Sequence, residues 1–236
     1  MTTQEPVEVP TSAPSGREIN TRGRLTEAAY DFLKEGLLEG RYAPGQRIAL
    51  DSVADAIGAS RQPVMDAMRR LSSEGFLSVV PQVGCLVVQP DKREIADFLR
   101  MLASVEGTCA ELAAERATDA ELELLQLKVK QFSDQMRDGL LLEEHAHAFR
   151  LHNRDFHHLL YSFAHSEMVS TFAASMSDRA DFYIAAAIGT KPFGERFWEA
   201  VEEHRRIAEV LTWRDGPAVR RVIETHVLLF IDNLHS

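Results

Sequence analysis

The sequence predicts a mainly α-helical protein in two folded parts: a small N-terminal unit of helices closed by a β-hairpin, and a C-terminal antiparallel bundle of six helices. Three observations support this prediction. Apolar residues recur at helical spacing over most of the chain. The period changes once, to two short β-prone runs within residues 76–88. Beyond Pro90 the helical spacing returns with short connections, which favours antiparallel helices.

Composition excludes several classes of protein. Hydrophobic residues make up 45% of the chain, enough to bury a core, so wholesale disorder is not expected. We expect no membrane span, because no apolar run reaches the length of about 18 residues that a span needs, and the N-terminus has no secretory signal pattern. Cys85 and Cys109 form no CxxC pair, which fits a reducing compartment. The sequence therefore predicts a cytoplasmic protein.

The N-terminal part begins with an arm and a helix. Residues 1–16 contain three prolines among polar residues and no Lys or Arg, so we expect a flexible arm without a role in DNA contact. From Leu25 to Glu39 the apolar residues fall on one helical face. Gly40 and the following Pro-Gly pair are expected to end this helix.

Two further helices are predicted before the hairpin. We expect Asp51 to be the N-cap of a short helix that ends at Ile57. After a tight turn, Ser60 is expected to cap the next helix, in whose first turn the missing N–H of Pro63 costs little. Gly75 ends this third helix. Its predicted buried face comprises Val64, Ala67, Met68 and Leu71.

A hairpin completes the N-terminal unit. The runs 76–80 and 85–88 are β-prone and are separated by a Pro-Gln-Val-Gly turn. Helix, short helix, turn, helix and hairpin is the layout of a winged helix-turn-helix. We assign residues 17–90 to this domain and residues 91–236 to the bundle. Its expected helices span 92–116, 119–137, 141–163, 167–188, 194–213 and 215–234.

The third helix carries a pattern suited to reading DNA. Arg61, Met65 and Arg69 follow one another at four-residue spacing on an exposed line, beside Gln62. Such side chains reach base edges, Arg towards guanine and Gln towards adenine, while flanking cations bind phosphate. Solvated helix residues produce the same pattern, so the interpretation depends on the whole layout. The candidate DNA contacts are Arg47, Ser60, Arg61, Gln62, Met65, Arg69, Arg70 and Gly84.

Charge is divided unevenly along the chain. Residues 17–90 carry nine basic and nine acidic side chains, whereas residues 91–236 carry 17 basic and 25 acidic ones. Phosphate neutralisation supplies most non-specific affinity for DNA, so the neutral N-terminal domain needs a local basic face. Modest affinity per protomer favours a homodimer that reads two half-sites.

The N-terminal pattern resembles the DNA-binding domain of GntR-family regulators. The matching residues are Pro44-Gly45, Arg47, Ser60-Arg61, Pro63-Val64, Ala67, Leu71, Glu74-Gly75 and Gly84. Two positions depart from the family pattern, since Met65 and Val83 stand where relatives carry arginines that contact DNA. Met65 could still contact a thymine methyl group. The resemblance implies a transcription regulator that binds double-stranded operator DNA.

Histidines gather in the second half of the chain. Asn153 and His157 share a helix face, and His204 and His226 fall on the last two predicted helices, so the three helices could line one cavity. The pattern is similar to the FCD-type domain of the FadR subfamily, and its six-helix length is closer to the VanR-like group. In many relatives an Asp and three His bind a divalent metal that holds a carboxylate ligand. The resemblance implies Zn²⁺, Ni²⁺ or Mn²⁺ at these four residues.

Two departures concern this site. Asn153 replaces the usual Asp, and a neutral amide oxygen is a weaker ligand, so a hydrogen-bonded cavity without metal remains the alternative. Leu102 stands four residues before Glu106, where relatives often carry an arginine that lines the ligand cavity. An organic-acid effector would then need another cation. The candidates for this role are Arg150, Arg154 and Arg179.

Both resemblances together imply a ligand-responsive transcription regulator, a repressor, and two other functions are the alternatives. A helical metalloenzyme is disfavoured because HExxH is absent and only Glu144 to His147 offers the Glu-x-x-His motif that a di-iron bundle needs twice. No Gly-rich phosphate loop occurs either. The other alternative is a metal-free regulator whose helical domain only dimerises. We expect no enzyme activity.

Overall fold

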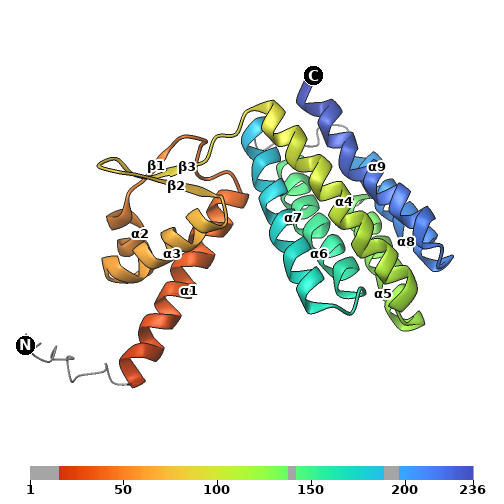
Figure 1. Cartoon of the computed structure of the whole chain (residues 1–236), viewed down its shortest axis with the longest axis horizontal. Coiled ribbons are helices and arrows are strands. Elements are labelled where there is room, and N and C mark those ends of the chain that lie inside the picture. The colour runs from red at the N-terminus through yellow and green to blue at the C-terminus, as the bar shows by residue number, and fades with distance from the viewer. Residues whose placement is uncertain (1–15, 138–141, 189–196, 236) are drawn as a thin grey trace, which may run out of the picture.

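The computed structural model of the chain describes residues 16–137, 142–188 and 197–235. Figure 1 shows two parts joined near residue 90. The N-terminal part contains α1 (Gly16–Leu38), β1 (Arg47–Ile48), α2 (Leu50–Ile57), α3 (Arg61–Ser73), β2 (Leu77–Val80) and β3 (Gly84–Val87). The C-terminal part contains α4 (Lys92–Arg116), α5 (Asp119–Arg137), α6 (Leu142–Ser162), α7 (Glu167–Ile188), α8 (Phe197–Thr212) and α9 (Gly216–His235).

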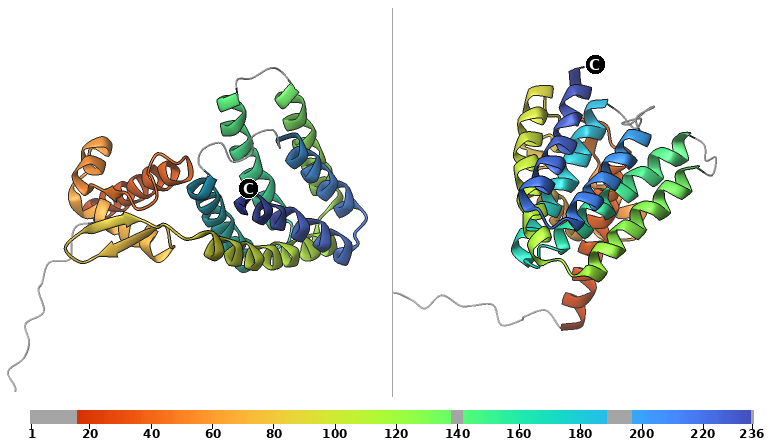
Figure 2. Two further views of the ribbon diagram at one scale, coloured as in Figure 1. Left: turned by 90° about the horizontal axis from the view of Figure 1, so that it is seen from above. Right: turned by 90° about the vertical axis from the view of Figure 1, so that its right-hand side faces the viewer.

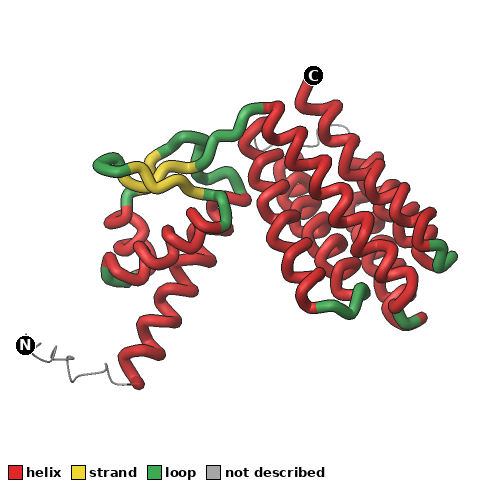
Figure 3. Tube along the Cα trace, in the orientation of Figure 1, coloured by secondary structure: helices red, strands yellow, loops and turns green. Residues whose placement is uncertain are grey.

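The mainly helical fold class is confirmed, with the strands confined to one small sheet (Figure 3). The bundle helices begin and end within three residues of their predicted bounds. The first helix is longer than predicted, because it already begins at Gly16, the last residue assigned to the arm. The rest of the predicted arm, residues 1–15, lies outside the described residues.

The small sheet has a third strand that the sequence did not predict. Its antiparallel order is β1-β3-β2, with Arg47 opposite Leu86 and Ile48 opposite Cys85. β1 has only two residues, and it exists because β3 offers a free edge to it. The hairpin is therefore one side of a three-stranded wing.

One predicted helix cap is wrong. α2 begins at Leu50 with Ala49 as its N-cap, so Asp51 lies inside the first turn, where a carboxylate still favours the positive end of the helix dipole. Its side chain binds Arg61 instead. Ser60 is the N-cap of α3 in extended backbone, as expected, but its side chain makes no capping hydrogen bond.

The N-terminal core is the one predicted from α3. Its apolar stripe is buried against α1, and β2 and β3 cover the same core with Leu77 and Val87. This core continues into the second part of the molecule, since the rings of Phe76 and Phe182 lie 5.4 Å apart between their centroids. The two parts are therefore in direct apolar contact through α7.

The bundle packs α4 along α9, α6 against α7 and α5 against α8, as the two views of Figure 2 show. α4 begins at a capping box, in which Asp91 and Glu94 each accept a hydrogen bond from the other's backbone N–H. None of the described helices is long and apolar enough to cross a membrane. The arrangement brings α6, α8 and α9 together in the middle of the bundle, where the predicted histidines lie.

Candidate functional site

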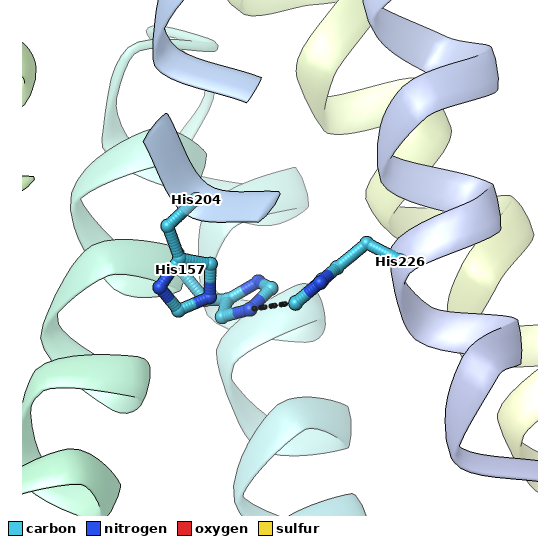
Figure 4. Close-up of side chains that lie close together, drawn as sticks. All are labelled: His157, His204 and His226. Atoms are coloured by element: carbon cyan, nitrogen blue, oxygen red, sulfur yellow. Dashed lines mark hydrogen bonds between the residues drawn. The ribbon is translucent and has the colours of Figure 1, made fainter. Parts of the chain in front are cut away.

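Three buried histidines from three helices meet inside the bundle (Figure 4). His157 on α6, His204 on α8 and His226 on α9 are 3%, 0% and 3% exposed. One ring nitrogen of each lies within 4.8 Å of the others, and the Nε2 atoms of His157 and His226 are 3.3 Å apart. These residues form the histidine site. Convergence of imidazoles from separate helices is the arrangement that a metal site needs, and it could hold a metal ion.

α6 positions two of the four predicted ligands. Asn153 and His157 are one helical turn apart on the buried face of α6. The Oδ1 atom of Asn153 is buried and has no hydrogen-bond partner among the described residues. A buried polar atom without a partner costs free energy, which makes it a candidate for binding a group not provided by the described chain.

Two carboxylates orient two of the histidines. Nδ1 of His226 lies 2.7 Å from Oε2 of Glu203, and Nδ1 of His157 lies 2.9 Å from Oε2 of Glu106. The hydroxyl of Tyr161 donates to the other oxygen of Glu106 over 2.5 Å. A carboxylate at Nδ1 favours the proton there and turns Nε2 towards the histidine site. The two Nε2 atoms share a hydrogen bond, so a cation bound by both would replace the proton between them.

Sequence reasoning missed the role of both carboxylates. Glu106 was noted only as a marker for a neighbouring position, and Glu203 was not singled out, although it directly precedes His204. Glu106 lies on α4, about 50 residues from His157, so no local pattern connects the two. For Glu203, its position next to the predicted ligand His204 is the only signal that the sequence offers.

Burial and neighbouring charges shift the pKa values of His204 and His157 in opposite directions. Burial and the adjacent histidines hold the pKa of His204 well below its usual value, so this ring is neutral. Burial would also lower the pKa of His157, but the Glu106 carboxylate outweighs it and raises that pKa. The pKa of Glu106 is lowered because His157 more than offsets the effect of burial. The histidine site therefore contains one neutral imidazole, that of His204, and an ion pair between His157 and Glu106. A metal bound to His157 could take the place of the proton in this pair.

A fourth histidine borders the site. The ring of His152 stacks on Phe132 with centroids 3.6 Å apart and lies 5.5 Å from the ring of His204. Burial lowers the pKa of His152 to about 4, so it is neutral as well. With Phe132 and Phe156 it lines a cavity of about 660 Å³ between α5 and α6. This volume lies in the range of small-molecule sites.

The three candidate effector arginines are not brought together. Arg150 and Arg154 are half-buried on α6, and the charge of Arg154 acts on Asp181 of α7. Arg179 instead lies over the rings of Phe98 and Tyr183 and reaches Gly75 of the N-terminal part. The structure thus corrects the expectation for Arg179, because α7 turns this side chain towards the junction of the two parts.

The exposed face of α3 carries the predicted base-reading residues. Arg61 is 74% exposed on its side chain and binds both oxygens of Asp51, each over 2.5 Å. Gln62 and Arg69 share Asp66 as their partner. These donors are occupied by carboxylates in the free protein, so the predicted contacts with DNA require those carboxylates to be displaced.

The other candidate DNA contacts divide between the wing and the back of α3. Arg47 lies beside the wing turn, where a side chain on Gly84 would come within 3.4 Å of its Nε atom. Arg70 lies 3.7 Å above the ring of Tyr30 and pairs with Glu27 and Glu74. Its contacts with α1 indicate a structural role, and its contact with the DNA backbone stays a prediction.

Known proteins share both parts of the chain. Residues 25–87 match the model of the gntR family of bacterial regulatory proteins, and residues 97–229, more than half of the chain, match the FCD domain. The chain is 25% identical over 197 residues to the uncharacterised HTH-type transcriptional regulator YdhC of Bacillus subtilis, which covers 84% of this chain and 85% of that protein. It is 22% identical over 210 residues to the HTH-type transcriptional repressor RspR of Escherichia coli, covering 89% of each.

Solved structures have the same fold. E. coli McbR/YncC superposes with a TM-score of 0.73 at 22% identity, over 89% of this chain and 97% of that one. A GntR regulator described as putative, from Rhodococcus sp. RHA1, superposes with a TM-score of 0.69 at 16% identity, over 90% and 98% of the two chains. A winged DNA-reading domain followed by an FCD domain places this chain in the GntR family: it is a DNA-binding transcription regulator and not an enzyme.

Proposed function

We propose that this regulator is a repressor whose FCD domain binds a small carboxylate effector through a divalent metal. The observation that carries the proposal is the convergence of His157, His204 and His226 beside the unpartnered oxygen of Asn153. Three imidazoles and one oxygen leave room for a further ligand, and imidazole suits Zn²⁺ and Ni²⁺ in particular.

The charges around the site support a metal rather than a hydrogen-bonded cavity alone. Neither nitrogen of His204 has a hydrogen-bond partner among the described residues, and the ring is fully buried. A metal-free polar cavity would leave this ring and Asn153 unsatisfied, which is costly. The carboxylates of Glu106 and Glu203 stand behind the histidines and supply negative charge that the neutral Asn153 does not.

A metal held by Asn153 and the three histidines keeps a coordination position at which an anion can bind. We propose a small organic acid as the effector, with Arg150 or Arg154 as an additional cation on α6. The cavity between α5 and α6 gives such a molecule access to the wall formed by His152 and Phe156. The effector would change DNA binding only by preferring one arrangement of the DNA-reading domains.

Operator binding is assigned to α3 and the wing. We propose that Arg61 and Gln62 contact bases, with Ser60, Met65 and Arg69 beside them, and that Arg47 and the backbone at Gly84 contact the DNA backbone or the minor groove. We also propose that the DNA-reading domain comprises residues 17–90 and the FCD domain residues 91–236.

Substituting Asn153→Asp is expected to tighten metal binding by about tenfold or more, because it places a charged oxygen where a neutral one now lies. The side chains have the same shape, so the fold should not change. Titration calorimetry of metal-stripped protein with Zn²⁺ measures the effect. His152→Asn serves as a control in the same helix outside the histidine site. Equal Zn²⁺ affinity of Asn153→Asp and wild type would remove residue 153 from the ligand set.

We also propose a homodimer formed through the FCD domain. Helices α4 and α7 are neighbours in the bundle, and both carry exposed apolar side chains. These are Met101 on α4 and Met168 and Phe172 on α7. Large apolar side chains on neighbouring helices are typical of a surface that another chain covers.

The full-length protein should therefore sediment at twice the 26.5 kDa mass of the chain. Phe172→Glu is expected to shift it towards monomer, because an unpaired charge would be buried in the interface. Leu127→Glu, on the exposed face of α5, is the matched control and should remain dimeric. A wild-type monomer at micromolar concentration would refute the dimer, and a dimeric Phe172→Glu would exclude this surface.

A further inference from the structure

We propose that Asp178 on α7 is a positioning residue that couples the histidine site to the orientation of the DNA-reading domain. This inference rests on the proposed function, because it explains how a ligand in the FCD domain could change DNA binding. It depends on a chain of contacts that begins beside His157 and ends on α1, called here the α7 relay. Its members are His158, Asp178 and Lys34.

The α1 end of the relay is an ion pair between the two parts of the molecule. Nζ of Lys34 lies 2.5 Å from Oδ2 of Asp178, and these side chains are only 21% and 10% exposed. Burial alone would lower the pKa of Lys34, but Asp178, with a smaller contribution from Tyr30, raises it. Burial alone would raise the pKa of Asp178, but its contacts with His158 and Lys34 lower it. Both groups are therefore charged. A shielded pair of this kind has strict geometry, since a displaced partner leaves a desolvated charge.

The other end of the relay reaches the histidine site. Oδ1 of Asp178 lies 3.5 Å from Nε2 of His158, the residue that follows His157 on α6. Successive residues on a helix point in different directions, so one helix turn presents His157 to the site and His158 to α7. A shift or rotation of α6 that accompanies ligation of His157 would therefore move His158 against Asp178.

Apolar contacts next to the ion pair hold the DNA-reading domain on the same helix. Phe182, one turn beyond Asp178, packs on Phe76, and the guanidinium of Arg179 closes against Gly75. The apolar contacts stabilise the packing of the DNA-reading domain on α7 but have little directional preference. The ion pair favours one orientation of that domain. The relay thus links the histidine site to α1 through one residue, since Asp178 contacts both His158 and Lys34.

The first experiment needs no metal and no DNA. Lys34→Met keeps the apolar stem, and Asp178→Asn keeps the shape of the side chain. Both should loosen the DNA-reading domain and enlarge the maximum dimension of the metal-free full-length protein in small-angle X-ray scattering. Arg100→Met is the matched control, since it breaks a pair with Asp97 within α4 and should leave the profile unchanged. Wild-type profiles for both relay variants would overturn the proposal, whether or not the protein binds metal.

The second experiment measures coupling. The probe is a DNA duplex selected by wild-type protein from a random pool, with its Kd measured with and without saturating Zn²⁺. Wild type and Arg100→Met should show a change of about fivefold or more. Lys34→Met and Asp178→Asn should bind Zn²⁺ with wild-type affinity, but their DNA affinity should change less than about twofold on adding it.

The outcomes of this second experiment separate the two proposals. Coupling of wild-type size in both relay variants would overturn the role of Asp178 while leaving the metal site intact. A wild type that binds Zn²⁺ without any change in DNA affinity would also overturn it. A wild type that binds no Zn²⁺ contradicts the metal site instead, and the relay then stands or falls on the scattering result.

Discussion

The variant His204→Ala is expected to lose metal binding almost completely, by at least about 100-fold in affinity. Removing an outer partner of a metal ligand typically costs about 10–100-fold, so removing a ligand itself should cost more. His204 is fully buried, neutral and without a hydrogen-bond partner among the described residues. Nothing in its described surroundings competes with a metal for its lone pair.

The control for this variant has to separate ligation from packing. The ring of His204 stacks on Phe156 with centroids 4.2 Å apart, so alanine also removes a packing contact. His152→Ala removes a comparable buried ring, stacked on Phe132, that is not one of the three converging histidines. Calorimetric titration with Zn²⁺ and Ni²⁺ should show strong loss for His204→Ala and near wild-type affinity for His152→Ala. Unchanged affinity of folded His204→Ala would exclude it as a ligand.

The variant Arg61→Ala should lose specific operator binding by roughly tenfold to a hundredfold, because a good bidentate contact to a base is worth about 1–3 kcal/mol of discrimination. The protein should stay folded, since this side chain is largely exposed and its polar partner among the described residues is the equally exposed Asp51. The loss should be confined to the selected duplex, while binding to random DNA changes little.

Mobility shifts at one fixed salt concentration measure this effect. Arg205→Ala is the matched control, because it removes an exposed arginine paired with Glu202 on α8, away from the DNA-reading domain. Asp51→Asn adds an independent test: releasing Arg61 from its carboxylate should maintain or strengthen operator binding. Equal affinity of Arg61→Ala and wild type for the selected duplex would remove Arg61 from the interface.

Helical periodicity predicted most of the fold. Long amphipathic segments bury one face, and that requirement is local enough to be read from spacing, as the bounds of α4 to α9 show. β1 could not be found in this way, because a two-residue strand is defined by the edge of β3, nearly 40 residues away. The cap of α2 was misplaced by two residues because Leu50 and Asp51 both join the helix, and the Asp51 side chain binds Arg61.

The convergence of the three histidines was predicted from the sequence, but the residues around them were not. His157, His204 and His226 could be grouped because each falls on its own helix. The orientation of α7 decides that Arg179 faces Gly75 and that Asp178 faces Lys34, and this orientation depends on packing between distant helices. The contact between Glu106 on α4 and His157 on α6 also depends on packing between distant helices, so only the structure reveals it.

The metal content of the protein tests the central claim most directly. Wild-type protein purified without chelator should contain about one divalent ion per chain by mass spectrometry, and stripped protein should take up Zn²⁺, Ni²⁺ or Mn²⁺ at neutral pH. Protons compete for the imidazoles, and because the pKa of His157 is raised, uptake should begin to weaken before the falling pH reaches the ordinary histidine value of about 6.5. A wild type that contains no metal and takes up none of the three ions at neutral pH would contradict the account.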